Sequence, residues 1–195
     1  FMGYAVVLFF LISGFCIHYP NTSGNARPSW KTYLVRRFWR IYPSYFAALL
    51  LTAGISYLCL TLWGDKNWDV SKIFRVASLT QNYPPGNGQF LSNPSLWTIP
   101  LEIEFYLLYP LAFVFFASSR SSLLWFFAFG MSGLSILLSY QGFEWLTFTA
   151  FFLWPSWLLG AWIAKLYRNQ QLNRIKLGYL LSLAGLSLGV SLISR

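Results

Sequence analysis

The feature that most constrains this chain is a succession of long apolar stretches with few charged residues. An α-helix needs about 20 apolar residues to cross the hydrocarbon core of a bilayer. Six stretches meet or approach that length: residues 1–18, 45–63, 96–117, 122–140, 146–164 and 177–193. Residues 122–138 and 177–193 carry no charge, so they lack the polar face that a helix of a soluble protein shows. The sequence therefore predicts an all-α membrane protein, a bundle of six transmembrane helices.

The composition also favours a membrane protein. Hydrophobic residues make up 56% of the chain and charged residues 10%, whereas a soluble domain carries roughly 25% charged residues. The 10 Trp residues suit the headgroup level of a bilayer. We interpret residues 1–195 as a single membrane-embedded domain. Because apolar stretches adjoin both ends, we expect a piece of a longer protein, truncated at both ends.

Basic residues divide unevenly between the connections of the predicted helices. The connection at residues 21–44, the one after the third stretch and the one after the fifth hold ten of the 14 Lys and Arg residues and no acid. These connections alternate with the others, so six spans place them on one side, which the positive-inside rule assigns to the cytoplasm. Such loops account for the net charge of +9, and we therefore expect no nucleic-acid partner.

Two carboxylates, Glu102 and Glu104, lie inside the third stretch. Ionisable residues within a membrane span are costly and commonly functional. Two helical residues separated by two positions differ in direction by roughly 200°, so these side chains cannot form a paired dyad. Tyr106 and Tyr109 share the face of Glu102, and we therefore expect Glu102 to face the bundle interior. There it either takes part in function or hydrogen-bonds a neighbouring helix.

A second candidate site is the pair Arg37 and Arg40, which lie on one helical face. Such a pair can bind phosphate oxygens through forked guanidinium groups. Basic residues beside a span also bind lipid headgroups, and the residues alone favour this interpretation. Glu102 falls roughly 9 Å below the outer end of its span and about 20 Å from the inner surface. We therefore expect Glu102 and the arginines not to contact the same atoms.

The remaining reactive residues offer weaker candidates. His18, the single histidine, could act as a general base, but its place near the inner end of a span favours an interfacial residue. Cys16 and Cys59 fall near opposite ends of adjacent predicted spans, so we expect no disulfide. One histidine and two separated cysteines do not make a metal site, and none is expected.

Three segments occur in a recognisable order. They are residues 8–15 (LFFLISGF), residues 36–43 (RRFWRIYP) and residues 93–110 (NPSLWTIPLEIEFYLLYP). They resemble the FFxxSGF, RRxxRIYP and PLWSLSVExxFYLLYP motifs of the acyltransferase 3 family. The resemblance covers about the first 110 residues, and the rest is similar only as apolar helices.

The resemblance implies a membrane enzyme that transfers an acyl group, often acetyl, from acyl-CoA to a hydroxyl of a cell-envelope carbohydrate or related acceptor. O-acetylation of a polysaccharide at the bacterial inner membrane is the typical case. The resemblance makes Arg37 and Arg40 the expected contacts of the coenzyme's phosphates. Glu102 occupies the position of the motif's glutamate and is the expected catalytic carboxylate.

The chain departs from the family pattern at two positions and lacks one element. Glu104 stands where the family has an uncharged amide, and Pro100 replaces a small serine, which predicts a kink. The family's catalytic histidine belongs to a helix before the FFxxSGF segment, and His18 does not match it. We therefore expect this piece to be inactive alone. A transporter or flippase with Glu102 as its ion or substrate site is the alternative, and a non-catalytic scaffold is a third.

Overall fold

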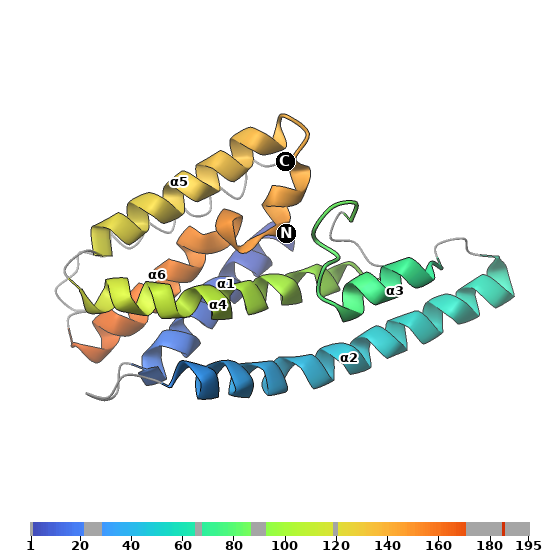
Figure 1. Cartoon of the computed structure of the whole chain (residues 1–195), viewed down its shortest axis with the longest axis horizontal. Coiled ribbons are helices and arrows are strands. Elements are labelled where there is room, and N and C mark those ends of the chain that lie inside the picture. Colours follow the sequence, from blue (N-terminus) through green and yellow to red (C-terminus); the bar gives the residue numbers. More distant parts are fainter. Residues whose placement is uncertain are drawn as a thin grey trace.

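A computed structural model describes residues 2–21, 29–64, 68–86, 93–118, 121–170 and 185. These ranges contain helices and no strand, which confirms the all-α prediction (Figure 1). The α-helices are α1 (Met2–Asn21), α2 (Trp30–Trp63), α3 (Val70–Ala77), α4 (Thr98–Ala117), α5 (Ser121–Ser139) and α6 (Ala150–Arg168). Two short 3₁₀ helices, η1 (Pro94–Trp97) and η2 (Glu144–Phe148), precede α4 and α6.

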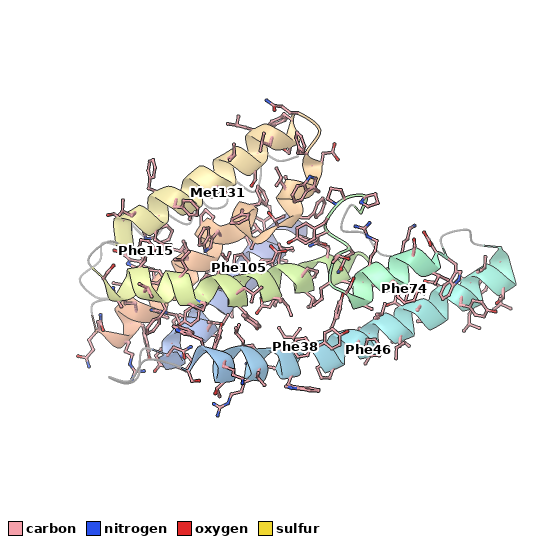
Figure 2. The ribbon with its side chains drawn as sticks, in the orientation of Figure 1. Phe38, Phe46, Phe74, Phe105, Phe115 and Met131 are labelled. Carbon is pink, nitrogen blue, oxygen red and sulfur yellow. The ribbon has the colours of Figure 1, made fainter. Side chains whose placement is uncertain are left out.

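Five of these helices, α1, α2, α4, α5 and α6, are long and apolar enough to cross a bilayer. They correspond to the first five predicted spans, with ends that differ by a few residues, so the chain is a multi-pass integral membrane protein. The sixth predicted span, residues 177–193, lies outside the described residues. Aromatic side chains cover part of the outer surface: Figure 2 labels Phe38 and Phe46 on α2 and Phe74 on α3, which are 41%, 39% and 71% exposed. Such a surface suits contact with lipid.

Helix α2 begins much earlier than the sequence suggested. Residues 30–44 were expected to form part of a loop, yet the helix runs from Trp30 for 34 residues, about 51 Å at 1.5 Å per residue. The reason is an apolar face: Trp30, Tyr33 and Leu34 pack against the bundle core and hold the basic segment in a helix. The helix ends at Gly64, whose φ of 69° is the left-handed conformation that glycine adopts easily at a C-terminal cap.

The interior of the bundle is built around α1, α4 and α6. Helices α1 and α6 cross in close contact, because Gly14 faces the backbone of Trp157 and Gly160 faces that of Leu11. Helix α4 packs beside them and beside α2 (Figure 1). The ring of Phe105 on α4, labelled in Figure 2, stacks on Trp157 at a centroid distance of 5.3 Å. Small residues thus bring two backbones together, and aromatic rings fill the neighbouring space.

The helix ends that carry basic residues, as far as the structure describes them, lie together at one end of the bundle. Lys165 near the end of α6 donates a hydrogen bond of 2.5 Å to the carbonyl of Phe116 near the end of α4. The guanidinium of Arg168 lies 5.5 Å from the ring of Tyr19 near the end of α1. The start of α2 meets the end of α1 at the same place. This agrees with the prediction that the basic connections share one side of the membrane.

At the opposite end, α3 turns back along α2 (Figure 1). The hydroxyl of Tyr45 donates to the carbonyl of Val76 at 2.7 Å. Helix α4 then begins after η1, and Pro100 lies in its first turn. At that position the missing N–H of proline breaks no helical hydrogen bond, so Pro100 helps to begin the helix instead of kinking it. The expected kink at Pro100 was therefore wrong.

Candidate active site

A cavity of about 530 Å³ opens where α1 ends and α2 begins. Within α2 its lining residues recur at helical spacing, so they occupy one face of the helix. Of the described residues that line it, none is acidic. The lining is Pro20, Asn21, Ser29, Thr32, Tyr33, Arg36, Arg37 and Arg40.

The charge of this cavity comes from three guanidinium groups, those of Arg36, Arg37 and Arg40. Hydroxyls of Ser29 and Thr32 lie 3.2 Å apart on the same face and add hydrogen-bonding capacity. Forked cationic donors beside hydroxyls are the groups that bind phosphate oxygens in proteins. The cavity is therefore suited to a polyanionic ligand. The structure brings the predicted pair Arg37 and Arg40 to one cavity and adds Arg36 to it.

Arg37 is held in place by two aromatic rings. Its guanidinium carbon lies 5.7 Å from the ring centroid of Tyr33 and 5.6 Å from that of Tyr106. An arginine over an aromatic face at this distance is attracted by the ring's quadrupole. Arg37 is half-buried, whereas Arg36 and Arg40 are exposed. The cation of Arg37 therefore reaches further into the bundle than its neighbours do.

Glu102 lies in the bundle interior, as predicted, with 6% of its surface exposed. Its Oε1 accepts two hydrogen bonds, from the hydroxyl of Ser13 on α1 at 2.8 Å and from that of Tyr106 at 2.7 Å. Its Oε2 has no hydrogen-bond partner among the described residues. One oxygen therefore fixes the carboxylate to two helices, and the other keeps its capacity to accept a proton or a hydrogen bond.

Glu102 and Arg37 lie nearer to each other than the expected depth of about 20 Å implied, although they contact different atoms of Tyr106. Tyr106 contacts both groups, since its ring lies beside Arg37 and its hydroxyl donates to Glu102. The reason is that residues 30–44, expected as a loop at the inner surface, are helical. In the structure they form the first turns of α2, and Arg37 lies seven residues, about 10 Å, along the helix from Trp30.

Glu104 has different partners and faces another part of the fold. Its Oε1 accepts a 2.8 Å hydrogen bond from the hydroxyl of Tyr83, and its Oε2 accepts one of 2.6 Å from the backbone N–H of Ala150. Ala150 is the first residue of α6, so the carboxylate meets the positive end of that helix. Burial, followed by the nearby Glu104 carboxylate, raises the pKa of Tyr83, which keeps the hydroxyl protonated as a donor. Glu104 thus ties a loop to the start of α6 and forms no dyad with Glu102.

His18 is buried, with 2% of its surface exposed, and is not the interfacial residue that the sequence suggested. Its Nδ1 lies 3.3 Å from the hydroxyl of Tyr109, and its ring packs 5.0 Å from that of Phe116. The expectation failed because α1 continues to Asn21 and carries the ring into an aromatic cluster with α4.

Sequence reasoning did not single out Ser13, Tyr33 or Arg36. The spacing of residues 29, 32, 33, 36, 37 and 40 was a signal for one polar face, and it could have added Tyr33 and Arg36. Ser13 carried a weaker signal, a hydroxyl within an apolar run. Its partner on α4 depends on how two helices cross, which periodicity does not specify.

Comparison with known proteins agrees with the motifs. The model of the acyltransferase 3 family, described as an acyltransferase domain, matches residues 1–194. The chain is 30% identical over 140 residues to acyltransferase MdmB of Streptomyces mycarofaciens, which covers 70% of this chain and 35% of that protein. The chain thus spans about a third of the length of this relative. No solved structure matches the chain. Since the family model accounts for almost every residue, the chain belongs to the acyltransferase 3 family of membrane acyltransferases.

Proposed function

We propose that this acyltransferase takes its acyl group, such as acetyl, from acyl-CoA on the cytoplasmic side and transfers it to a hydroxyl of a cell-envelope carbohydrate or related acceptor. The observation that carries the donor proposal is the cavity, whose described lining holds three arginines and no acid. The nucleotide portion of coenzyme A carries several phosphates on a compact scaffold. Arg36, Arg37 and Arg40 have the charge and the forked geometry that such a group requires.

The position of the cavity supports a cytoplasmic donor. It lies at the end of the bundle where the basic helix ends gather, which the positive-inside rule assigns to the cytoplasm. Coenzyme A thioesters are charged and do not cross a bilayer unaided, so their phosphates would bind on that side. A hydroxyl acceptor on an envelope carbohydrate is the family's usual partner, and Glu102 is the polar group that would meet it inside the bundle.

The proposed reaction is a direct acyl transfer. The acceptor oxygen bonds to the thioester carbonyl carbon, the carbon–sulfur bond breaks, and coenzyme A leaves as a thiolate that takes up a proton. The proton of the acceptor hydroxyl passes to a general base, which we expect to be the histidine that the family carries in a helix before residues 8–15. Glu102 orients the acceptor hydroxyl or a polar partner through Oε2, which has no hydrogen-bond partner in the part of the chain that the structure describes. No metal or bound cofactor has a role in this scheme.

The test follows radiolabelled acetyl-CoA, with the label in the acetyl group, in native membranes that hold the intact protein. We expect label in the envelope carbohydrate, competition by the adenosine bisphosphate portion of coenzyme A, and loss of transfer in Arg37→Ala and Arg40→Ala. Lys72→Ala is the matched control, because Lys72 is an exposed cation on α3 at the other end of the bundle. It should transfer like the wild type.

Each result bears on a separate part of the proposal. Unchanged transfer in both arginine variants at equal protein level would remove the donor role of the cavity. Label in lipid or protein, with none in carbohydrate, would overturn the acceptor class. Membership of an acyltransferase family favours this enzyme over the transporter and scaffold alternatives. Movement of an intact envelope precursor across the membrane without any acyl transfer would reverse that choice.

A further inference from the structure

Tyr106 connects the arginine-lined cavity to the carboxylate of Glu102 through two different parts of its side chain. The ring lies 5.6 Å from the guanidinium carbon of Arg37, which lines the cavity. The hydroxyl donates to Oε1 of Glu102 at 2.7 Å. The side chain is 6% exposed, so neither contact is a chance encounter at a mobile surface.

The second donor to the same oxygen is Ser13, at 2.8 Å. Two donors from two helices on one carboxylate oxygen fix the rotation of the carboxylate group. Because both bonds go to Oε1, Oε2 remains without a partner among the described residues. A carboxylate that merely joined α1 to α4 would satisfy both oxygens, since a buried acceptor without a partner is costly.

We propose that Tyr106 is a positioning residue with two separable tasks: its ring holds Arg37 toward the donor cavity, and its hydroxyl, with Ser13, directs Oε2 of Glu102 toward the acceptor. This inference rests on the proposed acyl-CoA-dependent transfer. It adds residues to which the motifs had assigned no task. It also explains how one side chain keeps Arg37, on the donor side, and Glu102, on the acceptor side, in a fixed relation.

The two tasks separate in kinetics. Tyr106→Phe keeps the ring and removes the hydroxyl, so we expect kcat to fall about 10- to 100-fold while KM for acyl-CoA stays within about twofold. Tyr106→Leu removes ring and hydroxyl, so KM for acyl-CoA should also rise about fivefold. Ser13→Ala should lower kcat and leave that KM unchanged. Tyr57→Phe is the matched control, because Tyr57 is an exposed tyrosine on α2.

The assays use the intact protein in native membranes, with rates normalised to the amount of protein present. A purely structural Tyr106 would change kcat and KM together in Tyr106→Phe, or neither, and either pattern overturns the proposal. Should Tyr106→Phe lower the amount of protein, Ser13→Ala carries the same test for Glu102, and a wild-type kcat there also overturns it. Absence of transfer by the wild type would instead refute the proposed function, so the two failures are distinguishable.

Discussion

Replacing Gly160 by alanine should force α1 and α6 apart. A Cβ at Gly160 would lie 2.7 Å from the carbonyl carbon of Leu11 and closer still to its oxygen. Carbon atoms in good contact are about 3.5–4.0 Å apart, so the backbones must separate by roughly 1 Å. On the other side of the crossing, a Cβ built on Gly14 would lie 3.0 Å from the carbonyl carbon of Trp157 and closer still to its oxygen. Neither obstacle is a flexible side chain that could rotate away.

The expected destabilisation follows from two opposing effects. Overpacking of a tight interior costs about 1–3 kcal/mol. An alanine in the middle of a helix gains about 0.5–1 kcal/mol over glycine, which offsets part of that cost. Gly130 provides the matched control, because it lies in α5 with open space around its added Cβ. The helix gain is common to both variants, so Gly160→Ala should be about 1–3 kcal/mol less stable than Gly130→Ala.

The assay is reversible unfolding of the purified intact protein in mixed micelles, followed by far-ultraviolet circular dichroism. Gly130→Ala should unfold at the same or a higher denaturant fraction than the wild type, and Gly160→Ala at a lower one. The variant should also lose activity, because Ser13 lies next to Gly14 and its 2.8 Å bond to Glu102 does not survive a shift of roughly 1 Å. Equal stability of the two variants would refute the inference that backbone contact sets the α1–α6 distance.

Three further predictions test other parts of the structure. Asn82→Ala removes two 2.9 Å hydrogen bonds to backbone carbonyls of η1 and η2 and should lower the free energy of unfolding by about 2–4 kcal/mol in the same micelle assay. Lys165→Met removes the hydrogen bond to the Phe116 carbonyl and should increase amide hydrogen exchange in the last turn of α4, with no change in α5. The orientation in the membrane can be tested in a variant that lacks both native cysteines and carries a single new one, either Lys31→Cys or Lys72→Cys. An impermeant maleimide should label the Lys72 variant in intact cells and the Lys31 variant after permeabilisation, and the reverse pattern would invert the assigned orientation.

The helices were predictable because the bilayer leaves the backbone little choice. An apolar stretch inside hydrocarbon must satisfy its N–H and C=O groups internally, and a helix does so within one segment. The described spans accordingly match the apolar runs. The start of α2 was not predictable by this argument, because Arg36 and Arg37 lowered the hydropathy of a segment that is helical for another reason. Its apolar face packs on the bundle, and packing overrides the hydropathy of single residues.

The candidate site was predictable only where helical periodicity determines the direction of a side chain. The inward direction of Glu102 followed from the tyrosines that share its face, and it is buried as expected. Its partner Ser13 lies 89 positions away along the chain, and no pattern within α4 specifies which α1 residue comes opposite. The prediction that His18 is interfacial failed for the same reason, because the aromatic cluster that buries it comes partly from another helix.

The relation between Arg37 and Glu102 bears on whether this site is structural or catalytic. Intramembrane charges commonly pair with one another, which lowers the cost of burying them. A pair selected for stability alone would place the guanidinium directly on the free carboxylate oxygen, because a bidentate contact is the strongest that these groups make. Here Arg37 lies against the ring of Tyr106, and Oε2 of Glu102 has no partner among the described residues. The two opposite charges are near enough to stabilise each other, yet among the described residues Oε2 of Glu102 keeps its hydrogen-bonding capacity for another group. That arrangement gives up stability and is the one expected where an anionic donor and a hydroxyl acceptor must both bind.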